Sequence, residues 1–322
     1  MTGRTGGVSL GIDVGGTKML AVAVDGAGEV VGERRRPTPA TPGAIADALV
    51  DLVDVVRSEA DRAGPGGVAC VGVGVPGLVD RSGVLRFAPN LPGVTEFPVA
   101  RLLAERTALP VRVDNDATCA AWAEHEVGAG AGSSDMVLVT LGTGIGGGIV
   151  AGGRVLRGKN GFAGELGHMV VERDGVPCPC GRRGCWERYA SGSALGRMAR
   201  DAAAAGGAAR VLELAGGDLD AIHGEHVTRA VLEGDREALA LLETMAGWLG
   251  VGLVNIVNAF DPELLVIGGG LVEIGEPLLA PARRSFAARA VAPSHRPEVP
   301  IVPASLGERA GAIGASLLAR EG

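Results

Sequence analysis

Cysteine and aromatic residues are scarce in this sequence. Only five of its 322 residues are cysteine, and 3% are aromatic. The N-terminus also lacks the basic segment, apolar stretch and cleavage site of a secretory signal. We therefore expect a reducing, cytoplasmic setting, in which a group of cysteines indicates a metal site more often than a disulfide.

Long runs of basic residues are absent as well. The formal net charge is −7, and the one cluster of arginines, Arg34 to Arg36, is interpreted as a solvated turn. Without a basic stripe to contact a phosphate backbone, nucleic acid is not an expected partner.

One uncharged stretch, Met136 to Gly153, is long enough to span a membrane. Seven of its residues are glycine, and it alternates as paired strands do. We interpret it as part of a folded core, so no membrane association is expected.

What the chain has in abundance is glycine, 54 residues, within a sequence that is 47% hydrophobic. This composition is typical of a folded α/β protein with many tight turns, long enough for about two domains. Apolar runs predict strands, and helical spacing predicts helices between them. The expected strands lie within 8–25, 68–80, 111–113, 136–150 and 263–270, and the expected helices at 44–62, 98–107, 117–127, 236–258 and 308–318.

The first glycine turn follows the first predicted strand and reads Asp13-Val14-Gly15-Gly16-Thr17-Lys18. Glycines let backbone N–H groups approach a phosphate, while Thr17 and Lys18 can bind its oxygens and Asp13 can hold Mg²⁺ through water. The alternative is a plain hairpin with an exposed lysine.

A second turn, Gly142-Thr143-Gly144-Ile145-Gly146-Gly147, satisfies the dinucleotide fingerprint G-x-G-x-x-G. A true fingerprint opens a helix, whereas here the sequence continues as a strand, so we reject that interpretation. No P-loop sequence is present either. Two strand–turn–strand units remain, each able to grip a phosphate chain.

These motifs resemble the sugar kinase/actin/Hsp70 superfamily. Asp13 to Lys18 and Leu141 to Gly148 are similar to its two phosphate turns, and Ile267 to Gly270 to its adenosine turn, which implies nucleotide contacts at Gly268, Gly269 and Gly270. The segments around residues 114–116 and 164–187 narrow the resemblance to the ROK family, over residues 10 to 318, with glucokinases as the nearest members.

The resemblance implies two actin-like (ribonuclease H-like) α/β domains around a cleft. The smaller domain would comprise residues 1–114 plus 305–322. The larger domain would comprise residues 115–304 and carry a zinc-bound loop.

Three of the five cysteines fall within eight residues. His168 with Cys178, Cys180 and Cys185 offers one nitrogen and three sulfurs, a tetrahedral Zn²⁺ ligand set. Pro179, Gly181 and Gly184 supply the turns that the loop needs. A redox role is the alternative, but the spacing C-x-C-x4-C is not that of a C-x-x-C motif.

Two acids flank this cluster, Glu165 before the histidine and Glu187 after the last cysteine. If one ring nitrogen of His168 binds zinc, the other N–H becomes a fixed donor. The resemblance implies that Glu165, His168 and Glu187 bind hexose hydroxyls, so the zinc shapes the sugar site without taking part in phosphoryl transfer. Alternatively, Glu187 is a surface acid near Arg188.

Asp114-Asn115-Asp116 ends one predicted strand and begins a helix. An aspartate there, ionised at neutral pH if its pKa is the ordinary value of about 3.9, can accept the proton of an attacking hydroxyl. The alternative is that Asp114 or Asp116 only caps the helix. The resemblance singles out Asp116 as general base and Asn115 as a sugar ligand, with Asn90 as a further contact. His125, His223 and His226 are interpreted as surface or helix residues.

Together these features predict a cytoplasmic, ATP- and Mg²⁺-dependent kinase of glycolysis that phosphorylates the 6-hydroxyl of glucose. Domain closure would exclude competing water. Alternatives are a fructokinase, an N-acetylhexosamine kinase or a polyphosphate-dependent enzyme. A sugar-sensing repressor of the same family would need a DNA-binding segment before Asp13, for which we see no room. The resemblance implies a dimer or tetramer.

Overall fold

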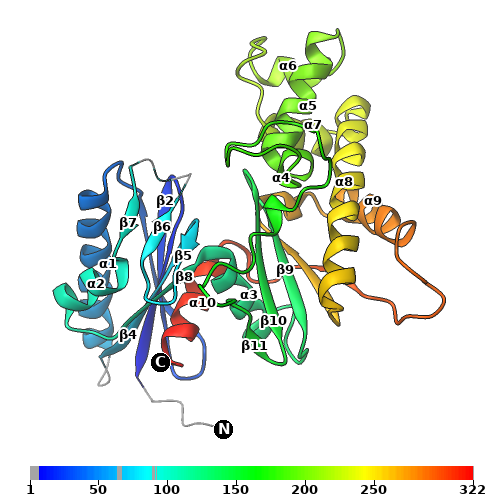
Figure 1. The fold of residues 1–322 in the computed structure, drawn as a ribbon. Coiled ribbons are helices and arrows are strands. Elements are labelled where there is room, and N and C mark those ends of the chain that lie inside the picture. The colour runs from blue at the N-terminus through cyan, green and yellow to red at the C-terminus, as the bar shows by residue number, and fades with distance from the viewer. Residues whose placement is uncertain (1–6, 64–66, 89–90, 92, 322) are drawn as a thin grey trace. The chain divides into compact units, whose positions relative to one another are not determined.

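The protein folds into two compact α/β units (Figure 1), described here from a computed structural model. The structure describes residues 7–63, 67–88, 91 and 93–321. Unit 1 comprises Met1–Ser134, Gly148–Gly164 and Ser305–Gly322, and unit 2 comprises Asp135–Gly147 and Glu165–Ala304. The expected larger domain, residues 115–304, differs from unit 2 because residues 115–134 and 148–164 belong to unit 1.

Unit 1 is built on a five-stranded sheet in the order β3-β2-β1-β4-β8. The hairpin β1–β2 is antiparallel, whereas β4 and β8 run parallel to β1. Apolar side chains fill both faces of the central strands, which is why they read as continuous apolar runs. The strands are β1 (Val8–Val14), β2 (Lys18–Val24), β3 (Val30–Pro37), β4 (Val68–Val75) and β8 (Val111–Asn115).

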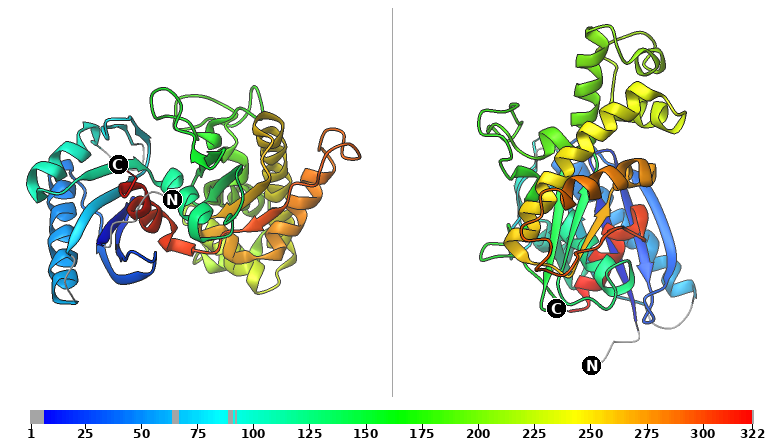
Figure 2. Two further views of the ribbon diagram at one scale, coloured as in Figure 1. Left: turned by 90° about the horizontal axis from the view of Figure 1, so that it is seen from below. Right: turned by 90° about the vertical axis from the view of Figure 1, so that its right-hand side faces the viewer.

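Helices cover both faces of this sheet (Figures 1 and 2). The helices α1 (Pro42–Ala63) and α2 (Val99–Thr107) pack together on one face, and α10 (Ala310–Ala319) lies on the other with α3 (Asp116–Val127) against it. All ten residues of α10 are buried. Glycine allows this depth: a Cβ at Gly11 would lie 1.8 Å from the Ala312 carbonyl oxygen, and one at Gly314 1.7 Å from that of Cys119.

The arginine cluster 34–36 lies in β3, an edge strand, and is not the turn that the sequence suggested. Its side chains are exposed and pair with acids, among them Arg36 with Asp51 at 2.8 Å. Charged side chains are common on edge strands because these strands are exposed to solvent and the charges discourage pairing with another chain. A small antiparallel sheet, which the sequence did not predict, completes unit 1: β5 (Leu78–Val79), β6 (Leu85–Phe87) and β7 (Thr95–Phe97).

The second large sheet has the order β11-β10-β9-β12-β13. Its antiparallel pair β9–β10 contains most of the uncharged stretch Met136–Gly153, confirming that this stretch forms strands of a folded core. The strands β12 and β13 run parallel to β9 and to one another. The bounds are β9 (Met136–Leu141), β10 (Ile145–Ala151), β11 (Arg154–Val155), β12 (Leu264–Gly268) and β13 (Ile301–Pro303).

Helices make up most of unit 2, and α8 is its central element. By length and composition alone this helix is the one described segment that could cross a membrane, but 56% of its apolar window is buried inside the protein. It packs along α9 and also contacts α4, α5 and α7 (Figure 2), as the core helix of a folded domain does. The bounds are α4 (Glu187–Ala190), α5 (Gly192–Ala204), α6 (Ala209–Leu214), α7 (Gly224–Leu232), α8 (Arg236–Phe260) and α9 (Glu276–Ala287).

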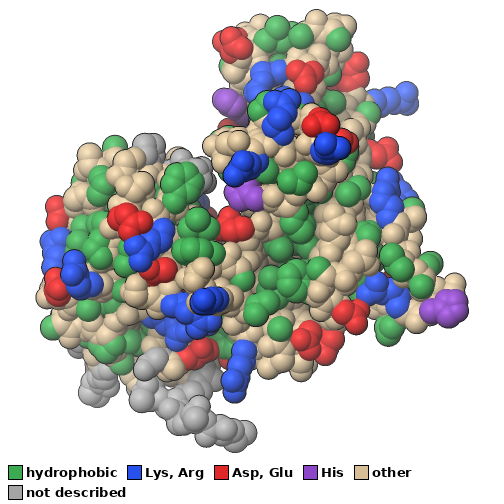
Figure 3. Space-filling model, viewed as in Figure 1, with side chains coloured by type: hydrophobic (Ala, Val, Ile, Leu, Met, Phe, Trp, Pro, Cys, Tyr) green, Lys and Arg blue, Asp and Glu red, His purple; other side chains and the backbone are tan. Residues whose placement is uncertain are grey.

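Charged side chains of both signs are interspersed on the face that Figure 3 shows. Basic residues there do not gather into one stripe, in keeping with the composition.

Candidate active site

The first glycine turn joins β1 to β2 and is closed by its own backbone. The Gly15 N–H donates to the Lys18 carbonyl at 2.8 Å, and the Thr38 hydroxyl donates to the Gly15 carbonyl at 2.6 Å. Gly16, Thr17 and Lys18 are exposed, so they are free to meet a ligand. Lys18 forms an ion pair of 2.6 Å with Glu308, which lies in the short 3-10 helix Gly307–Arg309 just before α10.

Asp13 stands at the end of β1, under the N-terminus of α10. A Cβ at Gly311 would lie 2.7 Å from the Asp13 carboxyl carbon, so only glycine lets the helix come this close. Burial raises the pKa of Asp13 to about 7, with the charge of Asp116 adding to the rise and Lys18 opposing it. A partly protonated carboxyl at neutral pH is ready to exchange its proton for a cation.

Asp116 is the first residue of α3, and its Oδ1 accepts from the Ala117 N–H at 2.8 Å. Burial raises its pKa as well, so the expectation of a solution-like aspartate is wrong. The two acids lie close together: a Cβ at Gly74 would be 3.4 Å from Asp116 Cα and 3.5 Å from Asp13 Oδ1. Two carboxyls in one half-buried place resist being ionised together.

The helix cap is Asn115, not one of the aspartates. Its Oδ1 accepts from the Thr118 N–H at 3.0 Å, and its amide nitrogen donates to the Gly77 carbonyl at 3.2 Å. Asp114 is buried and pairs with Arg157 at 2.6 Å. The capping alternative therefore fails for both aspartates, which leaves Asp116 available for chemistry.

In unit 2, the second glycine turn joins β9 to β10. The Gly142 N–H donates to the Gly144 carbonyl at 3.0 Å, while the N–H groups of Gly192 and Ser193, at the start of α5, donate to the Gly142 and Thr143 carbonyls. The chain leaves the turn as strand β10, which confirms that the G-x-G-x-x-G match is not a dinucleotide fingerprint. The third glycine segment adjoins the end of β9: Gly269 has a φ of 81°, and a Cβ there would lie 2.4 Å from the Leu141 carbonyl oxygen.

The cysteine loop brings its four predicted ligands together. The ligand atoms of His168, Cys178, Cys180 and Cys185 all lie within 4.8 Å of one another. The sulfurs of Cys180 and Cys185 are 3.6 Å apart, close to the edge of about 3.8 Å in a tetrahedron with Zn–S bonds of about 2.3 Å. The donor set and its spacing therefore fit a zinc ion.

Glycines shape the loop. Gly181 and Gly184 have φ values of 85° and 75°, and a Cβ at Gly184 would lie 1.7 Å from the Glu172 carbonyl oxygen. Isolated bridges between Val170 and Cys185, and between Pro177 and Arg183, hold the loop as a short irregular hairpin. As described, the loop contains no long strand or helix, and its three cysteines lie on irregular backbone.

His168 connects the cluster to the two flanking acids. Its Nδ1 faces Cys178 Sγ at 3.9 Å, and its Nε2 faces Glu165 Oε2 at 3.7 Å. Glu187 Oε1 lies 3.8 Å from Nδ1 and 3.1 Å from Cys178 Sγ. The Nδ1 atom therefore lies near both a thiol and the Glu187 carboxylate, and the Nε2 atom lies near the Glu165 carboxylate; binding of one ring nitrogen to zinc stays a prediction.

Glu187 is not a free surface acid. It is half-buried, and a Cβ at Gly144 would lie 2.5 Å from its Oε2, so it sits against the second glycine turn. Trp186, the residue before it, is fully buried and donates from its indole to the Trp248 carbonyl at 2.8 Å. A Cβ at Gly252 would lie 1.9 Å from this indole, so α8 provides a slot for it. Nothing in the residues around Trp186 predicts this contact.

Two further predictions concern other side chains. Asn90 lies outside the described residues. His125 stacks on Trp122 and bonds the Ser133 carbonyl, and His223 and His226 cap the start of α7, as their interpretation as helix residues predicted.

The motifs and their geometry agree with a comparison to known proteins, in which residues 9–322 match the family described as "ROK family". The chain belongs to the ROK family. A ROK relative named glucokinase, from Streptomyces coelicolor, is 41% identical over 318 residues, covering 98% of each chain.

A solved ROK glucokinase from Streptomyces griseus, in complex with glucose and AMPPNP, is 40% identical, with a TM-score of 0.87 over 98% of this chain and 100% of that chain. Another ROK relative, the N-acetylmannosamine kinase of Escherichia coli, is 37% identical over 315 residues, covering 97% of this chain and 98% of that protein.

Proposed function

We propose that this ROK protein is an ATP-dependent glucokinase that phosphorylates the 6-hydroxyl of glucose. The observation that carries the proposal is the full-length similarity, at 41% identity, to a protein named glucokinase. The solved relative that holds glucose and AMPPNP supports both substrates.

The hexose would be held by the acids and the histidine of the cysteine loop. In this proposal Glu165, His168 and Glu187 accept or donate hydrogen bonds to sugar hydroxyls, with Asn115 and Asn90 as further ligands. A planar imidazole with one nitrogen committed to a metal presents one N–H in a fixed direction, which favours one orientation of the sugar ring.

Asp116 would act as the general base. Its raised pKa moves it toward the operating pH, which improves a carboxylate as proton acceptor. The proton of the 6-hydroxyl passes to Asp116, the hydroxyl oxygen bonds to the γ-phosphorus of ATP, and the bond to the β-phosphate oxygen breaks to release ADP. We propose that the two units are an actin-like pair of domains that closes on the substrates and excludes water.

The glycine turns would bind the nucleotide. Each phosphate turn would offer backbone N–H groups and one hydroxyl to the phosphates: Gly15 to Lys18 with Thr17, and Gly142 to Gly144 with Thr143. The segment Gly268 to Gly270 would border the adenosine. Asp13 would hold Mg²⁺ through water, which neutralises phosphate charge when bound.

Zinc, held by His168, Cys178, Cys180 and Cys185, would be structural. Its contribution is to fix the loop, on the order of 10 kcal/mol of binding free energy for sites of this kind. All five cysteines are free thiols, which suits a cytoplasmic protein. A homodimer or homotetramer is the proposed assembly, by resemblance to the family.

Phosphorylation of an N-acetylhexosamine is the second candidate, because a relative of nearly the same identity is named N-acetylmannosamine kinase. The two activities share the loop and differ in the pocket around the 2-position of the sugar.

A coupled assay of the purified protein decides between them. Glucose, fructose, mannose, N-acetylmannosamine and N-acetylglucosamine are compared with ATP and with polyphosphate as donors. We expect glucose with ATP to give the highest kcat/KM, at least tenfold above any N-acetylhexosamine. A preference for an N-acetylhexosamine, or for polyphosphate, would reject this assignment.

A further inference from the structure

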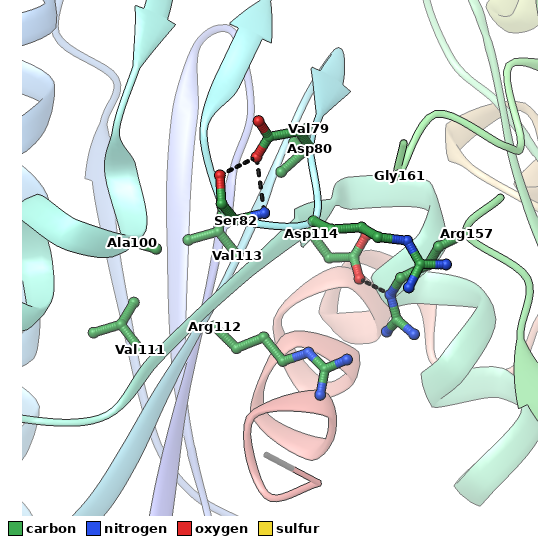
Figure 4. Close-up of a pocket in the computed structure, with 12 residues that line it drawn as sticks. Val79, Asp80, Ser82, Ala100, Val111, Arg112, Val113, Asp114, Arg157 and Gly161 are labelled. Carbon is green, nitrogen blue, oxygen red and sulfur yellow. Dashed lines mark hydrogen bonds and ion pairs between the residues drawn. The ribbon is translucent and has the colours of Figure 1, made fainter. Parts of the chain in front are cut away.

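A polar cavity of about 180 Å³ lies in unit 1, apart from the glycine turns (Figure 4). It is bordered by β8, by the loop that joins β5 to β6, by the start of α2 and by the segment 157–161. The lining residues with charged side chains are Asp80, Arg81, Arg112, Asp114 and Arg157. The space is large enough for several water molecules or for a small ion.

The cavity carries an excess of positive charge. Asp80 is already engaged, since its Oδ2 binds Arg86 at 2.6 Å and its Oδ1 accepts from the N–H groups of Ser82 and Val84. Asp114 pairs with Arg157, and Arg81 donates to the Gly158 carbonyl at 3.0 Å. The lining therefore holds three arginines against two carboxylates, both of which already have partners.

Arg157 has a donor left over. Its Nε binds Asp114 Oδ2 at 2.6 Å, and its side chain is only 17% exposed. Among the described residues, the Nη2 of Arg157 is one of few buried side-chain nitrogens without a hydrogen-bond partner. A buried guanidinium N–H without an acceptor costs free energy, so the site favours an acceptor that the protein itself does not supply.

Arg112 faces the same region from β8. The hydrogen bond from its Nη1 to the Leu318 carbonyl is long at 3.3 Å. In Figure 4 the guanidinium of Arg112 lies on the side of Asp114 to which Arg157 also reaches. Burial raises the pKa of Glu321, and the positive charges of Arg112 and Arg157 oppose this rise. Both guanidinium groups therefore act on the same carboxyl.

We propose that this cavity is a binding site for a small tetrahedral oxyanion, phosphate or sulfate. Arg112 and Arg157 donate to the anion, Arg81 adds to the field, and Asp114 holds Arg157 in position. Planar guanidinium groups match the oxygen spacing of such anions, and charge-assisted bonds in a partly buried site are strong. Glu321 is an internal competitor for the same charges.

Calorimetric titration of the full chain with inorganic phosphate tests this proposal, at constant ionic strength and with saturating Mg²⁺, AMPPNP and glucose so that the phosphate turns are blocked. We expect saturable binding of one ion. Arg112→Gln and Arg157→Lys should each weaken it about tenfold or more, since each removes a charged donor or its geometry. Glu321→Gln should tighten it severalfold.

The matched control is Arg101→Gln, which removes the same charge from an exposed arginine of α2 that pairs with Glu105 at 3.9 Å. Its affinity for phosphate should stay within about twofold of the unaltered protein. Thermal melts establish that each variant is folded. Absence of saturable binding, binding that the nucleotide abolishes, or equal affinity in Arg112→Gln and Arg101→Gln would overturn the proposal, and sulfate should behave as phosphate does.

Discussion

The acids of unit 1 and the acids of unit 2 are held in different ways. Asp13 and Asp116 stand at the ends of β1 and β8, fixed by sheet register and by glycines that let α10 and Asp116 itself come close. Glu165 and Glu187 flank an irregular loop that brings one histidine and three thiols together. The first pair is positioned by secondary structure, whereas the second adjoins a cluster of four candidate metal ligands.

Substitutions in the two regions should therefore have different effects. A change at the strand ends alters chemistry while leaving the fold intact, because the backbone there is secured by the sheet. A change at the thiols should loosen the proposed sugar-binding segment, because the packing of Trp186 and a few loop hydrogen bonds would then be its remaining supports. The following experiments are ordered by the size of the expected effect.

The largest effect is expected from Asp116→Asn. Loss of the proton acceptor should lower kcat by about 10²–10⁴-fold with little change in glucose affinity, since the amide preserves size and the Ala117 contact. Steady-state kinetics and calorimetric titration with glucose measure the two quantities. Asp218→Asn, on an exposed loop of unit 2, is the control; substantial turnover in Asp116→Asn would reject it as the base.

Next comes Cys185→Ser, which replaces a buried predicted zinc ligand. We expect zinc content to fall from about one ion per chain to well below it, and glucose affinity to drop about 10–100-fold. Binding of AMPPNP to the first glycine turn should persist. Cys70→Ser, a buried cysteine of unit 1, is the matched control. Unchanged glucose affinity in metal-free Cys185→Ser would contradict the positioning role of the ion.

A smaller effect is expected from Gly252→Ala, which disturbs the packing of Trp186 and leaves the predicted zinc ligands unchanged. The new methyl group would collide with the indole of Trp186 at 1.9 Å, at a cost of about 1–3 kcal/mol in stability. Displacing Trp186 moves its neighbour Glu187, so KM for glucose should rise more than kcat falls.

Gly247→Ala, in the same helix, has no atom within 4 Å of the added Cβ. It should keep the kinetics and gain up to about 1 kcal/mol in stability, because alanine is the better helix former. Equal effects of the two substitutions on KM would show that the indole slot does not position Glu187.

The smallest effect concerns pH. The folded pKa of Asp13, about 7, is above the ordinary value of 3.8. Its protonated form therefore favours the folded state: this contribution is fully present below about pH 4 and is lost as the pH rises through 7. Denaturant melts of the apoprotein should show this decline, and Asp13→Asn should flatten it.

Added Mg²⁺ with AMPPNP should offset the same decline, because a cation replaces the proton. An identical pH profile in Asp13→Asn would assign the decline to other groups. The charged groups near Asp13 are Asp116 and Lys18, so the same variant also tests whether Asp116 titrates alone.

Motifs that are contiguous in sequence could be predicted, because their function depends on local chain geometry. The two glycine turns, the strand–helix junction at residues 115–116 and the crowded cysteines all lie where the sequence placed them. Most predicted elements also formed, from β1 to α10, since their apolar periodicity is set within one element.

Contacts between distant segments could not be predicted. Nothing in the residues around Trp186 indicates that Gly252 leaves space for its indole, and nothing near Asp13 indicates that Gly311 faces it. The raised pKa of Asp116 could not be predicted for the same reason. The ordinary pKa depends on the aspartate side chain alone, whereas the rise comes from burial by distant segments. Asn115 caps the helix in place of the aspartates, because its Oδ1 accepts from the Thr118 N–H, and its amide nitrogen also bonds the Gly77 carbonyl.

The burial of α10 has a consequence for biosynthesis. This helix is synthesised after residues 165–304, the larger part of unit 2, yet it fills the face of the first sheet on which Gly11 and Asp13 lie. We therefore expect the cysteine loop to fold before α10 is made, whereas Asp13 stays uncovered until α10 has been synthesised.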